Sequence, residues 1–403
     1  MSEHGFQGQR LLAAVCVCGP ALVALIPMAA APAMPAMAER FAAGGNSQLF
    51  AQLVMTAPAI MLILAAPLAG LVAGWIGRRA TLLGSLILFV IGGAGVLLID
   101  SRPPLVAFRL LLGVAGGGLL TVCLALIGDN FRGEARERLL GYATSLASLV
   151  AALALVFGGR LVDLGGWRSP FGLYLLGIPV FAAAWFSIRP STLVSAENAK
   201  AGERRFVALA PMTPYYILLV LLTIGMFTPA IQVPFLLEAR GMTSAQLQGT
   251  IIAATSVVAI ASAGAYGWLR RWISVHGFLA IDALTMGMGI VVIASSDGTA
   301  GTFIGCALVG IGAGMSEPAI ASIIFDRTPA WAHALAMGLI VSALNVGQFV
   351  NPLAMAPLRA WFGVPQSFFC LGGVLIAVGL FIALRRRDEL VEVRSSETRE
   401  ALR

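Results

Sequence analysis

Residues 106–122, VAFRLLLGVAGGGLLTV, hold a single charge, Arg109, in a stretch that is otherwise apolar. Four glycines follow the arginine, at positions 113, 116, 117 and 118. The apolar run around them extends from 104 to 128. A helix of that length, which rises about 1.5 Å per residue, crosses a hydrocarbon core of about 30 Å. We therefore predict a membrane-spanning helix that carries a guanidinium group.

The composition of the whole chain agrees with a membrane protein. Hydrophobic residues make up 59% of the 403 residues, 11% are charged, and the mean hydropathy is +0.91. A soluble domain cannot bury so much apolar surface, so lipid is the expected solvent. The net charge is +7, and the basic residues that produce it lie in short gaps between apolar runs. This distribution favours a membrane protein over a nucleic-acid-binding one. The five cysteines sit inside apolar runs at no metal-ligand spacing, so neither a metal site nor a disulfide framework is predicted.

Hydropathy predicts an all-α polytopic fold with twelve transmembrane helices. The predicted spans are 11–38, 49–73, 80–99, 104–128, 139–161, 170–188, 213–237, 247–268, 278–295, 300–325, 334–357 and 366–384. The first run is longer than the apolar core of a secretory signal, about 7–15 residues, so we expect it to be retained as span one.

The basic residues predict the orientation of these spans. If the N-terminus is cytoplasmic, the inner segments hold 19 Lys and Arg residues and the outer segments hold six. The six are Arg40, Arg102, Arg160, Arg168, Arg240 and Arg359. Because inner loops of membrane proteins are enriched in Lys and Arg, both termini are predicted to be cytoplasmic.

The spans fall into two related halves. The longest polar interruption, 189–212, separates six spans from six, and features recur at an offset of 197 residues. Pairs at this offset include Gly113 and Gly310, Gly117 and Gly314, and Asp129 and Asp326. We predict an N-terminal six-helix half at 1–188, a cytoplasmic linker at 189–212, a C-terminal six-helix half at 213–388 and a cytoplasmic tail at 389–403.

Six plus six spans in parallel repeats resemble the Major Facilitator Superfamily of transporters. Between spans two and three that family carries G-x-x-x-D-R/K-x-G-R-R. Here Gly70, Gly77, Arg78 and Arg79 match this motif, whereas Gly74 replaces the aspartate and a tryptophan follows it.

Two further motifs carry the resemblance. In span four, Arg109 followed by Gly113 and Gly117 is similar to the family's arginine motif. In span five, proton antiporters of the family carry G-x-x-x-G-P-x-x-G-G. This chain keeps Gly158 and Gly159 but has Ala-Leu at the Gly-Pro positions. By resemblance, Arg78 and Arg79 brace the inner face when the transporter opens outward.

The resemblance implies a secondary active transporter in the inner membrane of a bacterium, similar to drug and metabolite efflux permeases. The expected mode is alternating access, with export of a small amphipathic molecule coupled to proton entry. One alternative is uptake or facilitated passage of a small metabolite or organic anion. An alternative from another class is a non-transporting receptor or lipid scramblase. The expected partners are a small-molecule substrate, lipid and protons, with no cofactor and a monomeric state.

Arg109 is the first candidate for a group that binds the substrate or couples its transport to protons. A charge inside a span costs about 2.5–3.5 kcal/mol on insertion scales and usually marks function. The alternative is a side chain that snorkels to the outer surface, since Arg109 lies near the start of its span. Prolines in span one free backbone carbonyls, and those of Met28 and Ala31 lie at a suitable depth to accept from the guanidinium.

The acidic residues are weaker candidates. Glu317, in span ten before Pro318, is a candidate for proton exchange, with a structural acid at a helix kink as the alternative. Asp282 lies near Arg270 and Arg271 and is predicted to form a structural ion pair.

Polar side chains elsewhere predict a mainly apolar cavity with sparse polar anchors. The candidates that share amide chemistry are Gln52 in span two, Gln232 in span seven, and Asn345 and Gln348 in span eleven. The alternative is that these amides stabilise helix packing.

Other classes of protein are disfavoured. The chain has no Walker lysine loop, so ATP is not expected to drive it. It has no HExxH sequence, and its three histidines lie outside the spans or at their edges, so an enzyme is not expected.

Overall fold

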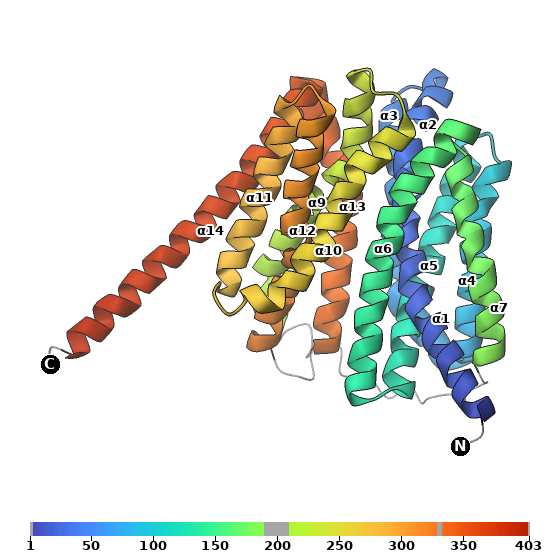
Figure 1. The fold of residues 1–403 in the computed structure, drawn as a ribbon, viewed down its shortest axis with the longest axis horizontal. Helices are drawn as coiled ribbons and strands as arrows, with labels where there is room; N and C mark the ends of the chain where they lie inside the picture. Colours follow the sequence, from blue (N-terminus) through green and yellow to red (C-terminus); the bar gives the residue numbers. More distant parts are fainter. Residues whose placement is uncertain (1–2, 189–208, 329–332, 402–403) are drawn as a thin grey trace. The chain divides into compact units, whose positions relative to one another are not determined.

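The computed structural model of the chain describes residues 3–188, 209–328 and 333–401 (Figure 1). The α-helices are α1 (Glu3–Met28), α2 (Met34–Arg40), α3 (Ser47–Ile76), α4 (Arg78–Ala94), α5 (Arg102–Asn130), α6 (Gly133–Gly165), α7 (Gly177–Ser187), α9 (Thr213–Ala239), α10 (Ala245–Leu269), α11 (Val275–Ser295), α12 (Thr299–Arg327), α13 (His333–Phe362) and α14 (Val364–Ala401). The 3-10 helices are η1 (Ala31–Ala33), η2 (Ala42–Gly44), η3 (Gly95–Leu98), η4 (Ser169–Leu176) and η6 (Ala210–Met212).

Twelve segments of the described chain are long and apolar enough to cross a membrane, and they coincide with the predicted spans. The predicted all-α polytopic fold is therefore confirmed. Most of the predicted linker, residues 189–208, lies outside the described residues.

Prolines account for two irregular spans. Span one is interrupted after Met28 by η1 and then continues as α2, with Pro27, Pro32 and Pro35 around the break. Span six opens with the 3-10 helix η4, which has Pro170 in its first turn, before α7 begins. Because proline removes a backbone donor and disfavours the preceding helical turn, both breaks leave carbonyl groups available to side chains.

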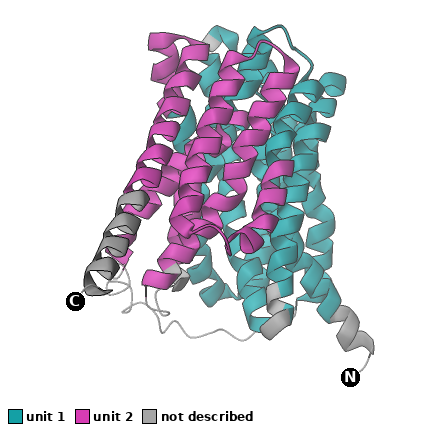
Figure 2. Cartoon of the chain, turned by 60° about the vertical axis from the view of Figure 1, so that its left-hand side comes forward, with its two compact units in different colours: residues 1–203, 230–256, 348–353 teal, residues 204–229, 257–347, 354–403 magenta. Residues whose placement is uncertain are grey.

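The chain divides into two compact units, coloured teal and magenta in Figure 2. Unit 1 consists of residues 1–203, 230–256 and 348–353, and unit 2 of residues 204–229, 257–347 and 354–403. Helices α9, α10 and α13 each contribute residues to both units. Unit 1 therefore includes parts of the predicted C-terminal half, which matters for the site described below.

Glycines let helices of unit 1 approach closely. A Cβ atom on Gly113 of α5 would lie 2.2 Å from the Pro58 carbonyl oxygen of α3. One on Gly117 would lie 2.8 Å from the Ala66 backbone nitrogen. The span-four glycines are thus required where α5 packs on α3.

The packing supports the predicted repeat. In unit 1, a Cβ atom on Gly92 would lie 2.8 Å from the Leu112 backbone nitrogen. In unit 2, a Cβ atom on Gly289 would lie 2.9 Å from the Val309 backbone nitrogen. Gly289 follows Gly92, and Val309 follows Leu112, by the same 197 residues that relate the sequence motifs. Unit 1 thus repeats in α4 and α5 a helix contact that unit 2 makes in α11 and α12.

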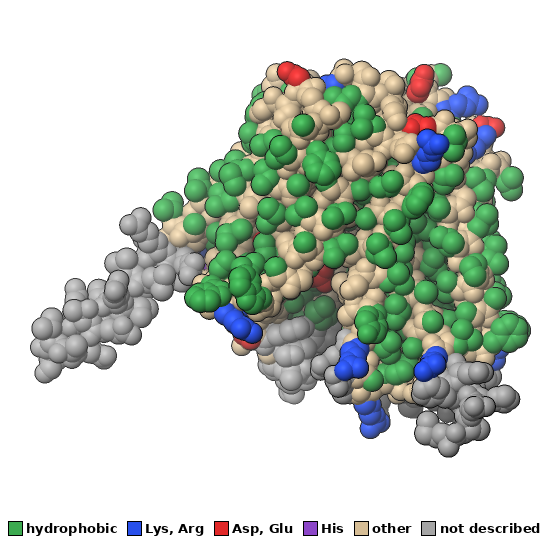
Figure 3. Space-filling view, viewed as in Figure 1, with side chains coloured by type: hydrophobic (Ala, Val, Ile, Leu, Met, Phe, Trp, Pro, Cys, Tyr) green, Lys and Arg blue, Asp and Glu red, His purple; other side chains and the backbone are tan. Residues whose placement is uncertain are grey.

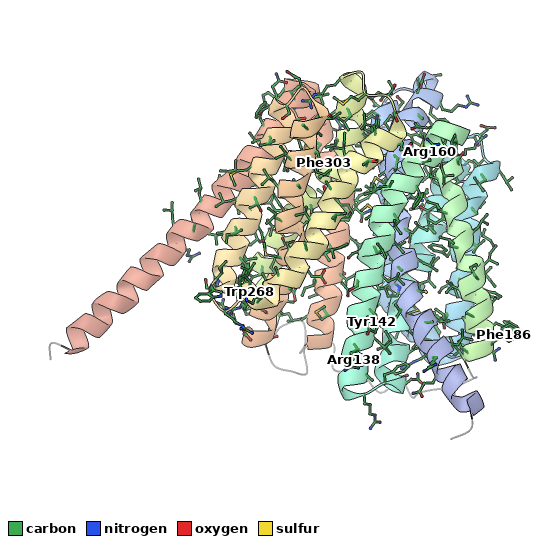
Figure 4. All side chains as sticks on the ribbon, viewed as in Figure 1. Arg138, Tyr142, Arg160, Phe186, Trp268 and Phe303 are labelled. Atoms are coloured by element: carbon green, nitrogen blue, oxygen red, sulfur yellow. The ribbon has the colours of Figure 1, made fainter. Side chains whose placement is uncertain are left out.

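The helical surfaces are apolar. On the face shown in Figure 3, hydrophobic side chains cover the lengths of the helices, and Lys and Arg side chains lie toward their ends. Arg138 and Arg160 lie near opposite ends of α6, as Figure 4 shows. Large exposed hydrophobic side chains such as Leu68, Phe157 and Trp268 suit contact with lipid.

Candidate functional site

The Arg109 side chain is completely buried in unit 1, so it does not snorkel to the surface. Its Nε atom donates to the Val54 carbonyl oxygen at 2.8 Å, and Nη1 donates to the Tyr174 hydroxyl at 2.9 Å. Nη2 donates to the carbonyl oxygens of Ile26 at 3.0 Å and Met55 at 3.4 Å. All of these acceptors are neutral, so they hold the guanidinium without cancelling its charge.

The sequence explains why these carbonyls are available. Pro58 lacks the N–H group that would bond to Val54 four residues earlier in α3. Ile26 lies in the last turn of α1, where carbonyls have no helical donor. The expectation that span one supplies an acceptor is met, although by Ile26 rather than Met28 or Ala31. The proline rule applied to span two would have identified Val54.

Tyr174, in η4, was not recognised from the sequence. Its hydroxyl accepts from Arg109 and donates to the Ile26 carbonyl oxygen at 2.7 Å. The guanidinium carbon lies 5.7 Å from the centre of the Phe171 ring and 5.8 Å from that of Tyr174, within cation–π range. Four elements, α1, α3, α5 and η4, therefore meet at one buried cation.

The motif between spans two and three orders one end of unit 1. Gly77 separates α3 from α4 with a φ of 86°, a conformation that favours glycine. Arg78 donates to the Ala125 carbonyl oxygen at 3.1 Å and forms an ion pair with Asp129 at the end of α5. This ion pair joins the start of α4 to the end of α5.

The other motif positions differ in their packing. Arg79 donates to the Trp185 carbonyl oxygen at 3.0 Å and lies over its ring at 5.2 Å. A Cβ atom on Gly74 would meet nothing within 4 Å, and one on Gly70 would meet Thr121 at 3.9 Å. These two glycines are therefore not required by packing.

Three amides meet in the interior of unit 1. The Gln52 side chain donates to Gln232 Oε1 at 2.9 Å and to the Ile231 carbonyl oxygen at 3.3 Å. Gln232 in turn donates to Asn351 Oδ1 at 2.7 Å. All three amides are at most 2% exposed. Their hydrogen bonds to one another favour the packing interpretation in this conformation.

The other two predicted amides are not part of these hydrogen bonds. The Asn345 side chain donates to the Val341 carbonyl oxygen of its own helix at 2.9 Å. Gln348 is 6% exposed and follows Asn345 by one turn in α13.

The span-five glycines contact α10 within unit 1. A Cβ atom on Gly159 would lie 2.3 Å from the Ala245 carbonyl oxygen, whereas Gly158 has 3.4 Å to its nearest neighbour. Near this contact, Asp163 accepts hydrogen bonds from the backbone nitrogens of Ala245 at 2.8 Å and Gln246 at 3.0 Å. It therefore caps the first turn of α10, a role that the sequence analysis did not recognise.

Glu317 lies in unit 2. It lines a cavity of about 100 Å³ whose walls come from α9, α11, α12 and α13. The lining residues are Leu219, Leu222, Thr223, Met226, Met286, Ala313, Ser316, Glu317 and Leu344. The Glu317 residue is exposed although it lies within a membrane span.

The predicted ion pair of Asp282 with Arg270 or Arg271 is wrong. Asp282 is 0% exposed, and neither of its carboxyl oxygens has a hydrogen-bond partner. Arg270 instead donates to the Ile273 carbonyl oxygen at 3.3 Å. The helical rotation of α11 turns the carboxyl into the packed interior, away from the loop that holds the arginines.

Comparisons with known proteins agree with this architecture. The sequence profile described as Major Facilitator Superfamily matches residues 16–330 and 218–403. The chloramphenicol resistance protein of Pseudomonas aeruginosa is 27% identical over 374 residues, covering 89% of this chain and 80% of that protein. The multidrug transporter protein MdtP of Bacillus subtilis is 30% identical over 109 residues, covering 27% of this chain and 20% of that protein.

Solved structures show the same fold at low identity. A D-xylose-proton symporter has a TM-score of 0.73 at 14% identity, covering 92% of this chain and 96% of that chain. An auto-inhibited POT family peptide transporter has a TM-score of 0.72 at 13% identity, covering 93% of this chain and 96% of that chain. With a family profile that matches nearly its whole length, and with twelve helical segments of the described chain able to cross a membrane, the chain belongs to the Major Facilitator Superfamily and is a multi-pass membrane transporter.

Proposed function

We propose that this transporter exports a small amphipathic molecule from the cytoplasm in exchange for protons, by alternating access of two six-helix halves. The substrate class is supported by relatives named for resistance to chloramphenicol and for multidrug transport.

The position of Glu317 is the observation that supports proton coupling. Glu317 is an acidic residue with exposed surface inside a membrane span, and it lines a cavity with walls that are mainly hydrocarbon. Ionisable groups inside spans are rare and usually serve ion or proton pathways. In the proposed cycle, Glu317 binds a proton from outside and releases it to the cytoplasm.

Arg109 supports export of a neutral or cationic molecule over uptake of an organic anion. Its donors are engaged by three carbonyls and the Tyr174 hydroxyl, so an anionic substrate would have to displace bonds that hold α1, α3 and η4. We propose that the positive charge acts within the protein, by fixing the broken segment of span one.

Alternating access is supported by contacts within unit 1 that can separate. The bonds of Gln232 to Gln52 and Asn351, and those of Asp163 to the start of α10, join segments from both halves of the sequence. When these side chains separate, they can form hydrogen bonds with water instead. Their separation is therefore reversible and requires little free energy. We propose that these contacts form on the outer side, with both termini in the cytoplasm of a bacterial cell and the transporter acting as a monomer.

The function is tested with chloramphenicol as the probe, in cells and in proteoliposomes. Expression is expected to lower cellular accumulation of the probe, and a protonophore is expected to abolish this effect. Glu317→Gln, which cannot exchange a proton, is expected to lose active export at matched expression. The matched control is Asp297→Asn, which changes an exposed acid outside the spans and is expected to retain export.

Two results would contradict the proposal. Export that persists with a protonophore present would remove proton coupling, and Glu317→Gln with unimpaired export would remove the assigned carboxyl group. If chloramphenicol is not moved, a panel of amphipathic cations and neutral compounds tests the substrate class, and failure of the whole panel rejects it.

A further inference from the structure

Asp282 is a buried carboxyl group that the function proposed above does not use. It lies in α11, which packs against α12 and α14 in unit 2. The residue is 0% exposed, and neither carboxyl oxygen has a hydrogen-bond partner. Ser316 of α12 is its polar neighbour, but the Ser316 hydroxyl donates to the Gly312 carbonyl oxygen at 2.8 Å.

The elements around Asp282 supply no described cation to neutralise it. On α12 the charged residues are Glu317, Asp326 and Arg327, and Arg327 donates to the Tyr215 hydroxyl at 2.8 Å. On α14 no charged residue occurs between Val364 and Leu384.

The remaining titratable neighbours are engaged elsewhere. His276 of α11 lies 3.3 Å from the Tyr215 hydroxyl. Tyr266 of α10 packs on Phe278, and its hydroxyl donates to Ser322. Because an ionised carboxylate without a partner is strongly disfavoured in such a place, Asp282 is expected to hold a proton.

The repeat indicates that packing does not require a carboxyl group here. At the offset of 197, the counterpart of Asp282 is Ser85 of α4, which is also buried. The Ser85 hydroxyl donates a hydrogen bond to the Thr81 carbonyl oxygen of its own helix at 2.8 Å. The same helix contact is thus built in unit 1 with a small hydroxyl, and the acid of unit 2 needs another explanation.

One cavity is lined both by the polar neighbour of Asp282 and by Glu317. Ser316 and Glu317 both line the cavity of about 100 Å³, as does Met286, one turn after Asp282 in α11. A cavity of this size, with Thr223, Ser316 and Glu317 as polar groups, has room and hydrogen-bonding partners for water. Ser316 is therefore both the polar neighbour of Asp282 and a wall residue of the cavity that Glu317 lines.

We infer that Asp282 is a second proton-binding site, which exchanges its proton with Glu317 through the Ser316 hydroxyl and water in the cavity. Asp282 gives its proton to the Ser316 oxygen, while Ser316 passes its own proton through water to the Glu317 carboxylate. The net change is a short-lived ionised Asp282 and a neutral Glu317, and the reverse step, which the burial of Asp282 favours, restores the first state. The role of this exchange in transport rests on the proton coupling proposed above, whereas the buried proton itself does not.

Infrared spectroscopy of the full-length protein in proteoliposomes tests the buried proton without any substrate. The spectrum is expected to contain a carbonyl band of a protonated carboxyl group that Asp282→Ser and Asp282→Asn both remove. Asp282→Ser copies the residue of the first half, and Asp282→Asn keeps the shape of the side chain, so the pair guards against a failure to fold. Asp297→Asn is the control that leaves the band intact. A spectrum that neither substitution changes would overturn the inference.

The exchange path has its own readout. Transfer to heavy water is expected to shift the Asp282 band, and Ser316→Ala is expected to slow that shift severalfold by removing the hydroxyl. An unchanged rate would reject the path through Ser316.

Transport separates this inference from the function proposed above. Asp282→Ser is expected to reduce the number of protons moved per probe molecule, while exchange of labelled for unlabelled probe across the membrane continues. A variant that moves as many protons as the parent would overturn the transport role. If the parent itself transports without protons, the proposed coupling fails, and the infrared result still decides whether Asp282 binds a proton.

Discussion

The Tyr174 hydroxyl lies between Arg109 and the end of α1, accepting from the guanidinium at 2.9 Å and donating to the Ile26 carbonyl oxygen at 2.7 Å. Arg109 also reaches Ile26 directly, at 3.0 Å, so the three groups form a closed ring of hydrogen bonds. Such a ring fixes the orientation of each member, because none can rotate without breaking two bonds. The break in span one is thus held in a defined geometry by residues of spans four and six.

Tyr174→Phe removes this hydroxyl and keeps the ring that packs against Gly93. We expect a loss of about 1.5–3 kcal/mol in stability, the usual worth of a hydrogen bond to a charged group. The measurement is the thermal unfolding midpoint in detergent, together with transport. Tyr142→Phe is the matched control, because Tyr142 is 61% exposed and lies on α6 (Figure 4). Equal midpoints for the two variants would show that the ring of bonds contributes nothing.

Arg109→Lys is expected to be nearly as damaging as Arg109→Ala. Lysine keeps the charge, but its single ammonium group cannot reach Val54, Ile26 and Tyr174 from one position as the planar guanidinium does. Both substitutions leave buried acceptors unpaired, at about 1–3 kcal/mol each. Transport of the probe is measured at matched membrane expression. Lysine that preserves most of the transport would show that charge alone matters.

Gly159→Ala is expected to weaken the contact of α6 with α10, because the added Cβ atom would lie 2.3 Å from the Ala245 carbonyl oxygen. A backbone oxygen cannot move aside as a flexible side chain can, so the conformation that contains this contact should become less populated. A cysteine introduced near the contact reports the change through its rate of labelling. Gly158→Ala, with its nearest neighbour at 3.4 Å, is the control. The same labelling rate in both variants would contradict this account.

Gly74→Asp restores the acid of the family motif at a position where a Cβ atom meets nothing within 4 Å. The substitution is therefore expected to be tolerated in folding, with an unchanged unfolding midpoint. We expect it to shift the conformational balance through the added charge beside Arg78 and Arg79. The readout is again labelling of a single introduced cysteine, here on the outer side. Unaltered labelling would remove the interpretation of this loop as a conformational latch.

The orientation predicts the activity of phosphatase fusions. Fusions at Gly44 and Gly298 are expected to be active because the predicted orientation assigns both positions to outer loops. A fusion at Glu203, which lies outside the described residues, is expected to be silent because it stays in the cytoplasm. The reverse pattern would invert the direction assigned to every helix.

The sequence was sufficient for the spans and the repeat, because both depend on length and spacing along the chain. The use of broken-helix carbonyls by Arg109 was also predictable, since a proline frees a known carbonyl. The particular acceptors were not, because the choice of Val54 and Ile26 depends on how α1 and α3 are rotated toward α5. Tyr174 carried no signal, as it is one aromatic residue in an apolar run.

The misassignment of Asp282 has the same origin. Its distance along the chain from Arg270 and Arg271 suggested an ion pair, yet one turn of helix decides whether a side chain points to a loop or to a neighbouring helix. The cap formed by Asp163 was missed because its partner, the start of α10, lies about eighty residues away in the sequence.

The repeat contact between α4 and α5, matched by that between α11 and α12, points to an ancestral duplication that has since become unequal. The counterpart of Arg109 at the offset of 197 is Cys306, which is buried, and the counterpart of Asp282 is Ser85. At these two pairs of positions, one copy thus carries a buried arginine or aspartate where the other has a smaller cysteine or serine. A buried cation in the first copy and a buried acid in the second make the two related helix pairs chemically unequal. Exchanging these two residues for their counterparts would return the protein toward a symmetric ancestor.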